Sequence, residues 1–166
     1  MDNIIKLMKE DNYIESNAIT IIPNATISQK TKDMYKKFRE RIEIDSQILQ
    51  VLANNICMDL SIIPVPIKFQ DKQPSRNDGK RLTQKTGGVY KRSRWSQGTV
   101  EVDTSETIQV YKYTTVRQKQ VAPKTAISTL LHELNHHIDY KIIGLVKSIH
   151  SKGFYLRLKY LTQLLT

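Results

Sequence analysis

Two histidines and a glutamate in the C-terminal third of this 166-residue chain have a spacing that suits metal chemistry. His132 and His136 lie four residues apart in a segment with helical periodicity, so their rings would share one helix face and could grip one ion. Imidazole nitrogen is a good ligand for Zn²⁺. Glu133 would be rotated by about 100° from His132, too far to be an obvious ligand but able to reach a water on the metal.

This H-E-x-x-H pattern is typical of zinc-dependent hydrolysis of peptide bonds, which needs three protein ligands and one open position on the ion. His150 is the histidine that lies outside the helix, and Gly144 allows the chain to turn back before it, so we expect His150 to be the third ligand. The ion would lower the pKa of a bound water towards ~7. Glu133 would take the proton of that water as general base and later deliver it to the leaving amine.

Three further side chains need an interpretation. His137 would point about 100° away from His136, and we interpret it as a non-ligand. Asp139 follows His136 by three residues and could orient a ligand histidine, but it could equally be solvated or paired with a lysine. A structural zinc site would want a fourth ligand; Cys57, the one cysteine, is distant in sequence and is better explained as a small buried residue.

The helix that positions the first two histidines is predicted between Ile127 and Ile142, after Pro123 and before Gly144. A last helix should begin at His150 or Ser151. The apolar stripe of the first helix comprises Ile127, Leu130, Leu131, Leu134, Ile138 and Ile142. Because the histidines avoid this stripe, they should face away from the core.

The residues before this helix predict one further helix and a small sheet. Residues 28–56 have apolar side chains at three- and four-residue steps and should form one long helix, begun by Ser28 or Thr31. Strands are expected near residues 65–69, 89–92, 99–102 and 107–113, with a long loop over residues 70–86. Residues 1–27 should be peripheral or partly disordered, with a helix near 3–10 at most. The sequence therefore predicts an α+β domain over residues 28–166, with three or four strands.

Positive charge is concentrated in two parts of the chain. Residues 66–100 carry nine Lys or Arg against two Asp, and residues 141–166 carry five bases and no acid, within a formal net charge of +10. Such patches attract nucleic acid, although a solvated surface is the more ordinary explanation, because basic runs are common on surfaces that bind nothing. Trp95 could stack on a base or, as we favour, anchor a strand end. The candidate nucleic-acid contacts are Lys80, Arg81, Lys91, Arg92, Arg94 and Trp95.

The sequence favours a cytoplasmic protein without membrane contact. A single cysteine excludes an intramolecular disulfide, which is typical of a reducing compartment. No apolar run reaches the roughly 18 residues that a bilayer span needs, and the N-terminus lacks the basic start and long apolar core of a secretory signal.

With these residues in place, the chain resembles the SprT-like zinc metallopeptidases over roughly residues 30–166. The resemblance rests on the motif His132–His136 and on His150, which is followed four residues later by the aromatic Phe154. Many members have glycine directly after the third histidine, where this chain has Ser151.

The resemblance implies a small zincin fold, a zinc ion held by His132, His136 and His150, and Glu133 as the catalytic base. A protein or peptide substrate would lie along an edge strand, for which the candidate is Thr107–Tyr113. Some SprT-like proteins act on proteins attached to DNA, which the basic residues 66–100 would suit.

Two other functions remain open at this stage. The helix motif also resembles the regulatory proteases of the ImmA/IrrE kind, which cut a repressor; an N-terminal helix-turn-helix would favour them, and none is evident. A non-catalytic, zinc-containing DNA-binding module is the other. Glu133 counts against this module, because binding alone has no need of that carboxylate.

Overall fold

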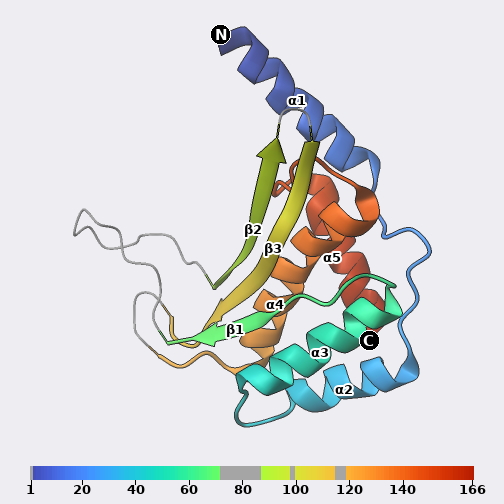
Figure 1. The fold of residues 1–166 in the computed structure, drawn as a ribbon. Coiled ribbons are helices and arrows are strands. Elements are labelled where there is room, and N and C mark those ends of the chain that lie inside the picture. Colours follow the sequence, from blue (N-terminus) through green and yellow to red (C-terminus); the bar gives the residue numbers. More distant parts are fainter. Residues whose placement is uncertain (1, 72–86, 98–99, 115–118) are drawn as a thin grey trace.

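A computed structural model of the chain describes residues 2–71, 87–97, 100–114 and 119–166, and within them the side chains of all but residues 2–8, 94–97 and 100–104. These ranges form an α+β fold of five α-helices and a three-stranded mixed sheet (Figure 1). The elements are α1 (Asp2–Ala18), α2 (Gln29–Arg39), α3 (Ser46–Asp59), β1 (Ile67–Gln70), β2 (Gly88–Gln97), β3 (Val100–Tyr111), α4 (Pro123–Ile138), the π-helical turn η1 (Asp139–Ile143) and α5 (Lys152–Leu165).

The sheet has the strand order β1-β3-β2, which makes β3 central and β2 an edge strand. β1 pairs with β3 in parallel, and β2 pairs with β3 in antiparallel orientation. The expectation of separate strands at 99–102 and 107–113 is wrong, because residues 103–106 continue one strand and contain neither Gly nor Pro to turn it. Thr107–Tyr113 is therefore not the edge that a substrate could join, since most of it is paired on both sides.

Helix α4 lies between the sheet and the other helices, and its apolar stripe forms the middle of the core. It packs against β2 and β3, while α2, α3 and α5 pack around it (Figure 1). Leu130, Leu134 and Ile138 are fully buried, as are Ile108 and Val110 of β3. The predicted helix over Ile127–Ile142 is confirmed, with its last turn widened into η1.

The single long helix expected over residues 28–56 is instead two helices, α2 and α3. Ser28 caps α2 by accepting a hydrogen bond from the Thr31 backbone amide at 3.3 Å. Asp45 caps α3 in the same way, through the Ile48 amide at 2.8 Å, so the chain restarts a helix there. Ile42, one of the apolar residues of the expected long helix, is 95% exposed in the connection between the two helices.

Helix α1 extends well beyond the short helix expected at residues 3–10. Its C-terminal end lies against α5, whereas its N-terminal end points away from the rest of the fold (Figure 1). Gly153 permits this approach, because a Cβ at that position would collide with the Ser16 carbonyl group. After α1 the chain places Ile22 in the core. Among the described residues, no helix has both the length and the apolar character needed to span a membrane.

Candidate metal centre

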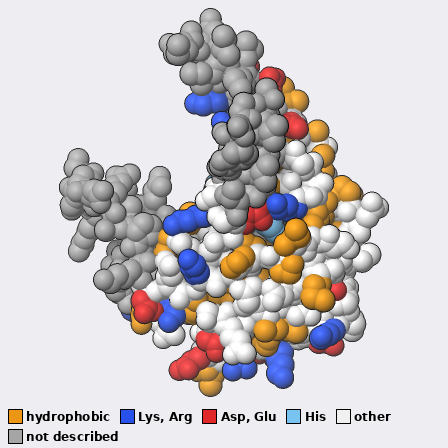
Figure 2. Space-filling model, viewed as in Figure 1, with side chains coloured by type: hydrophobic (Ala, Val, Ile, Leu, Met, Phe, Trp, Pro, Cys, Tyr) orange, Lys and Arg blue, Asp and Glu red, His pale blue; other side chains and the backbone are white. Residues whose placement is uncertain are grey.

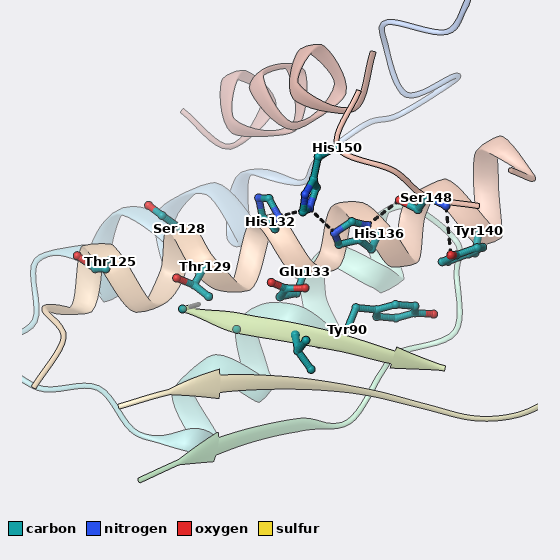
Figure 3. A pocket seen from close by; sticks show the side chains of 13 residues that line it. Tyr90, Thr125, Ser128, Thr129, His132, Glu133, His136, Tyr140, Ser148 and His150 are labelled. Carbon is teal, nitrogen blue, oxygen red and sulfur yellow. Dashed lines mark hydrogen bonds between the residues drawn. The ribbon is translucent and has the colours of Figure 1, made fainter. Parts of the chain in front are cut away.

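Three histidine side chains converge on one point above helix α4 (Figure 3). The Nε2 atom of His150 lies 2.9 Å from Nε2 of His132 and 3.1 Å from Nε2 of His136. A tetrahedral zinc ion with nitrogen ligands at about 2.0–2.1 Å would hold such atoms about 3.3 Å apart. The three side chains predicted as ligands are therefore close enough to bind one metal ion.

The route of the chain after α4 brings His150 to the other two histidines. The helix widens into η1 and ends at Gly144, whose φ of 76° is left-handed and favours glycine. Ser151 then caps α5 by accepting a hydrogen bond from the Phe154 amide at 3.1 Å, so His150 immediately precedes the helix. The buried Phe154 ring lies 4.6 Å from the His136 ring and forms an apolar wall behind the site.

Hydrogen bonds around His136 determine which of its nitrogens faces the cleft. The Ser148 hydroxyl group donates its hydrogen to Oδ2 of Asp139 at 2.7 Å, because a carboxylate can only accept. The hydroxyl oxygen of Ser148 lies 2.7 Å from Nδ1 of His136 and must accept from it. Nδ1 is therefore protonated, and the lone pair of Nε2 points at the other histidines. Asp139, predicted as a possible orienting residue, reaches His136 through Ser148 rather than directly.

Asp139 is fully buried, and its charge partner is Arg157 rather than a lysine. The Nε atom of Arg157 donates to Oδ1 of Asp139 at 2.7 Å, and Nη2 donates to Oδ2 at 3.0 Å. This two-point pairing holds the carboxylate in place. The group that receives the Ser148 hydrogen is consequently a fixed acceptor.

Glu133 forms part of the wall of the cleft beside the histidines and is only 6% exposed (Figure 3). Burial raises the pKa of its carboxyl group to about 7, and a hydrogen bond from the Tyr90 backbone amide partly opposes this rise. The side chain thus lies between α4 and the edge strand β2. Because its pKa is about 7, both of its protonation states are populated at neutral pH. Glu133 lies in the wall of the cleft, beside the group formed by the three histidines.

The environment of His132 and His136 favours their neutral forms. Burial, together with the neighbouring His132 and His150, lowers the pKa of His136 to about 3. Burial and His150 likewise lower the pKa of His132. Because a metal binds the neutral form of imidazole, these shifts favour the protonation state that a ligand needs.

His137 has a structural role away from the metal site. Its ring is fully buried, with Nε2 2.8 Å from the Ile63 carbonyl oxygen and Nδ1 3.2 Å from the Tyr90 hydroxyl group. Glu106 lies 3.4 Å from the same Nδ1 atom. The histidine therefore ties the segment before β1 and the strands β2 and β3 to α4.

A cleft of about 650 Å³ extends from the histidines along the N-terminal turns of α4. Its helix side carries Thr125, Ser128 and Thr129 (Figure 3), and its strand side is the start of β2. The Tyr111 amide donates to the Gly87 carbonyl oxygen at 2.9 Å. Because an antiparallel ladder alternates, the backbone groups of Gly88 then point away from β3, towards the free edge.

Several residues of this site carried no usable signal in the sequence. Ser148 is an ordinary polar loop residue there, and Tyr90 is one residue of a short apolar strand pattern. Gly88 directly precedes the strand expected near residues 89–92. Tyr140 is an aromatic residue after the H-E-x-x-H motif that could equally be a packing residue. In the structure its hydroxyl group accepts a hydrogen bond from the Ser148 amide at 3.1 Å, and its ring stacks on Tyr90.

The candidate nucleic-acid contacts were Lys80, Arg81, Lys91, Arg92, Arg94 and Trp95. The first two lie outside the described residues, and the last two lie in β2 with side chains outside the described part. Lys91 is exposed, and the guanidinium group of Arg92 lies 4.1 Å from the centre of the Tyr140 ring. Figure 2 shows the described basic side chains scattered over the viewed face among acidic and apolar ones. Nucleic-acid contact therefore stays a prediction.

Cys57 lies apart from the metal centre. It is fully buried in α3, and burial raises the pKa of its thiol to about 12.

No protein-family model, curated protein or solved structure gives a significant match to the chain. The functional interpretation therefore rests on the chemistry and geometry of this site.

Proposed function

We propose that this chain is a zinc-dependent metalloendopeptidase with a SprT-like site, in which His132, His136 and His150 hold the ion and Glu133 is the general base. The observation that carries the proposal is a buried carboxylate, with a pKa of about 7, in the same cleft as three convergent Nε2 atoms. Hydrolysis needs this pair of features, whereas metal storage or structural support needs only the histidines.

The donor set supports zinc as the metal. Three neutral imidazoles with one side open to a cleft are the usual ligands of a catalytic zinc ion, whereas a structural ion has four protein ligands. Within the described part of the chain, the group of potential ligands at this point consists of three histidines. When bound, zinc supplies a Lewis acid for the scissile carbonyl group and makes an attacking water more acidic.

Glu133 would move the proton between the water and the leaving group. A general base works best when its pKa lies near the working pH, and burial brings this carboxyl group to about 7. The Tyr90 amide holds the carboxylate in the cleft wall, so little reorganisation is needed when the water loses its proton. The protonated Glu133 then delivers the proton to the amine that leaves.

The substrate would bind as an additional strand along β2. This strand is the sheet edge beside α4, and Gly88 turns its backbone groups towards that edge. A peptide paired there would run past the three histidines, and main-chain hydrogen bonds would position its scissile bond. Proteins associated with DNA are the substrate class to test first, because residues 66–100 are strongly basic.

Two alternatives are less well supported. A repressor-cutting regulatory protease would be favoured by a helix-turn-helix with a turn of about three or four residues. Helices α1 and α2 are instead separated by residues 19–28, and α3 contributes buried residues to the core. A non-catalytic DNA-binding module would not require Glu133 to be buried in the cleft.

The test is cleavage of an unfolded, fluorescently labelled protein by the zinc-loaded chain, with and without DNA. Glu133→Gln should reduce the cleavage rate by about 100-fold or more, because the amide cannot accept the proton. The variant should keep its circular dichroism spectrum and its zinc content, since Glu133 is not a ligand.

Glu43→Gln is the matched control, because Glu43 is exposed in the connection between α2 and α3. It should cleave at the wild-type rate. Unchanged cleavage by Glu133→Gln would remove this residue as the base. A zinc-loaded wild-type chain that cleaves nothing under either condition would contradict the peptidase proposal.

A further inference from the structure

Arg157 is a fully buried cation whose hydrogen bonds join the two ends of the chain. Its Nη1 atom donates to the Ser16 carbonyl oxygen at 2.7 Å and to the Ile19 carbonyl oxygen, both at the end of α1. Its Nη2 atom also donates to the Ser16 hydroxyl group at 3.1 Å. The remaining donors engage Asp139, so the charge is compensated within the protein. The end of α1 therefore determines where this guanidinium group lies.

The same guanidinium group is connected to a metal ligand by three successive contacts. Arg157 holds the carboxylate of Asp139, the carboxylate accepts from Ser148, and Ser148 accepts from Nδ1 of His136. Each group in this series is held by the group behind it, since Arg157 holds Asp139 and Asp139 holds the Ser148 hydroxyl group. Displacement of Arg157 would thus release the carboxylate that orients the serine, and with it the histidine ring.

A second set of contacts joins α1 to the segment that carries His150. The hydroxyl groups of Ser16 and Ser151 lie 2.6 Å apart, and Ser151 is the cap of α5 directly after the histidine. The Asn17 side chain accepts a hydrogen bond from the Gly153 amide at 2.8 Å. The end of α1 therefore contacts the supports of both His136 and His150, although it lies more than a hundred residues away in the sequence.

We propose that Arg157 and the end of α1 are positioning elements of the metal centre, and that docking of α1 and metal binding are thermodynamically linked. This linkage rests on the proposed function, because it requires that the three histidines bind zinc. The docked α1 raises zinc affinity by holding two ligands in their binding geometry. By reciprocity, bound zinc stabilises the docked position of α1.

The experiment measures the zinc dissociation constant by competition with a chromophoric chelator, in the full-length chain. Ser148→Ala should weaken zinc binding by about 10–100-fold, which is the usual effect of losing a partner of a ligand histidine. Ser148→Thr keeps the hydroxyl group and should restore most of the affinity. Ser16→Ala and Asn17→Ala, at the end of α1, should weaken binding in the same direction.

Ser46→Ala is the matched control, because Ser46 is exposed at the start of α3 and should leave the affinity unchanged. Arg157→Lys keeps the charge but loses the two-point pairing, and it should weaken zinc binding if it folds. The α1 variants keep the proposal testable if it does not fold. Cobalt-substituted protein gives a second readout, since the α1 variants should alter its visible absorption spectrum.

The linkage is overturned if Ser16→Ala and Asn17→Ala bind zinc with wild-type affinity, even where their melting temperatures fall, because α1 would then act on stability alone. It is also overturned if zinc does not slow proteolysis within residues 19–28. A wild-type chain that takes up no zinc would overturn the proposed function, and the linkage with it. The first two outcomes leave the proposed function standing, so the two failures are distinguishable.

Discussion

The hydroxyl group of Ser148 decides which nitrogen of His136 is free to bind a metal. Its single hydrogen belongs to the hydrogen bond with Asp139, so it can only accept from Nδ1 of the histidine. The Nε2 lone pair then faces His150. A small loop residue with no signature in the sequence thereby fixes the tautomer of a ligand.

Gly88 lies so close to neighbouring residues that a side chain would not fit there. A Cβ there would lie 2.7 Å from Thr129 Cγ2, 2.8 Å from the Gln109 carbonyl oxygen and 3.2 Å from Glu133 Cγ. We predict that Gly88→Ala pushes β2 away from α4, lowers the free energy of unfolding by about 1–3 kcal/mol and slows cleavage. Urea denaturation and the cleavage assay measure the two effects.

Gly87→Ala is the control for this prediction. The three atoms nearest to a Cβ at Gly87 would all belong to the Thr129 side chain, with Oγ1 at 2.9 Å, and rotation of that side chain can relieve the contact. It should lower the free energy of unfolding by less than about 1 kcal/mol. Equal losses in the two variants would show that the contacts with backbone and Glu133 are unimportant.

At the scale of elements, the reversal of the chain between α4 and α5 brings His150 to the site. Gly144 ends η1 with a φ of 76°, and a Cβ there would have no neighbour within 4 Å. The only cost of a side chain is therefore backbone strain. We predict that Gly144→Ala lowers the free energy of unfolding by about 1–2 kcal/mol, measured by urea denaturation.

Gly144→Asn should cost less than alanine, because asparagine tolerates the left-handed conformation. An alanine variant as stable as the wild type would contradict the conformation assigned to this turn. A much larger loss would instead point to a contact made by an added side chain, which the empty surroundings of Gly144 exclude.

Helix α4 could be predicted from the sequence because its helical periodicity separates the buried apolar residues from His132 and His136 on another face. The same apolar periodicity over residues 28–56 missed the break before α3, because Asp45 acts through a local hydrogen bond that a periodic pattern does not register. The strand order was also missed. Alternation of apolar residues marks a strand, but it does not tell a central strand from an edge strand.

Contacts between distant parts of the chain explain the rest of the unpredicted features. Arg157 lies next to the apolar residues of the predicted last helix, but as a charged residue it would be expected at the surface. Its burial depends on the carbonyl groups of Ser16 and Ile19, and nothing local to either segment indicates this pairing. The predicted ligands, in contrast, were all within one stretch whose turn could be recognised from Gly144.

At the scale of the whole molecule, the candidate centre lies where three parts of the chain meet. Helix α4 contributes two histidines and the carboxylate, and the segment before α5 contributes the third histidine. Helix α1 contacts Arg157 on the His136 side, and Ser151 and Gly153 on the His150 side. The sheet offers the free edge of β2 beside the cleft. The N-terminal helix is thus part of the architecture that surrounds the site.

The proposed peptidase activity requires that one zinc ion be bound by three histidines from the two sides of this cleft. The most direct measurement is the zinc content of the purified chain after brief exposure to a chelator, compared with that of His150→Ala. Lys152→Ala, an exposed residue of α5, is the control. We predict one zinc ion per chain in the wild type and in Lys152→Ala, and loss of most of it in His150→Ala. A folded His150→Ala variant that retains zinc with wild-type affinity would contradict the claim.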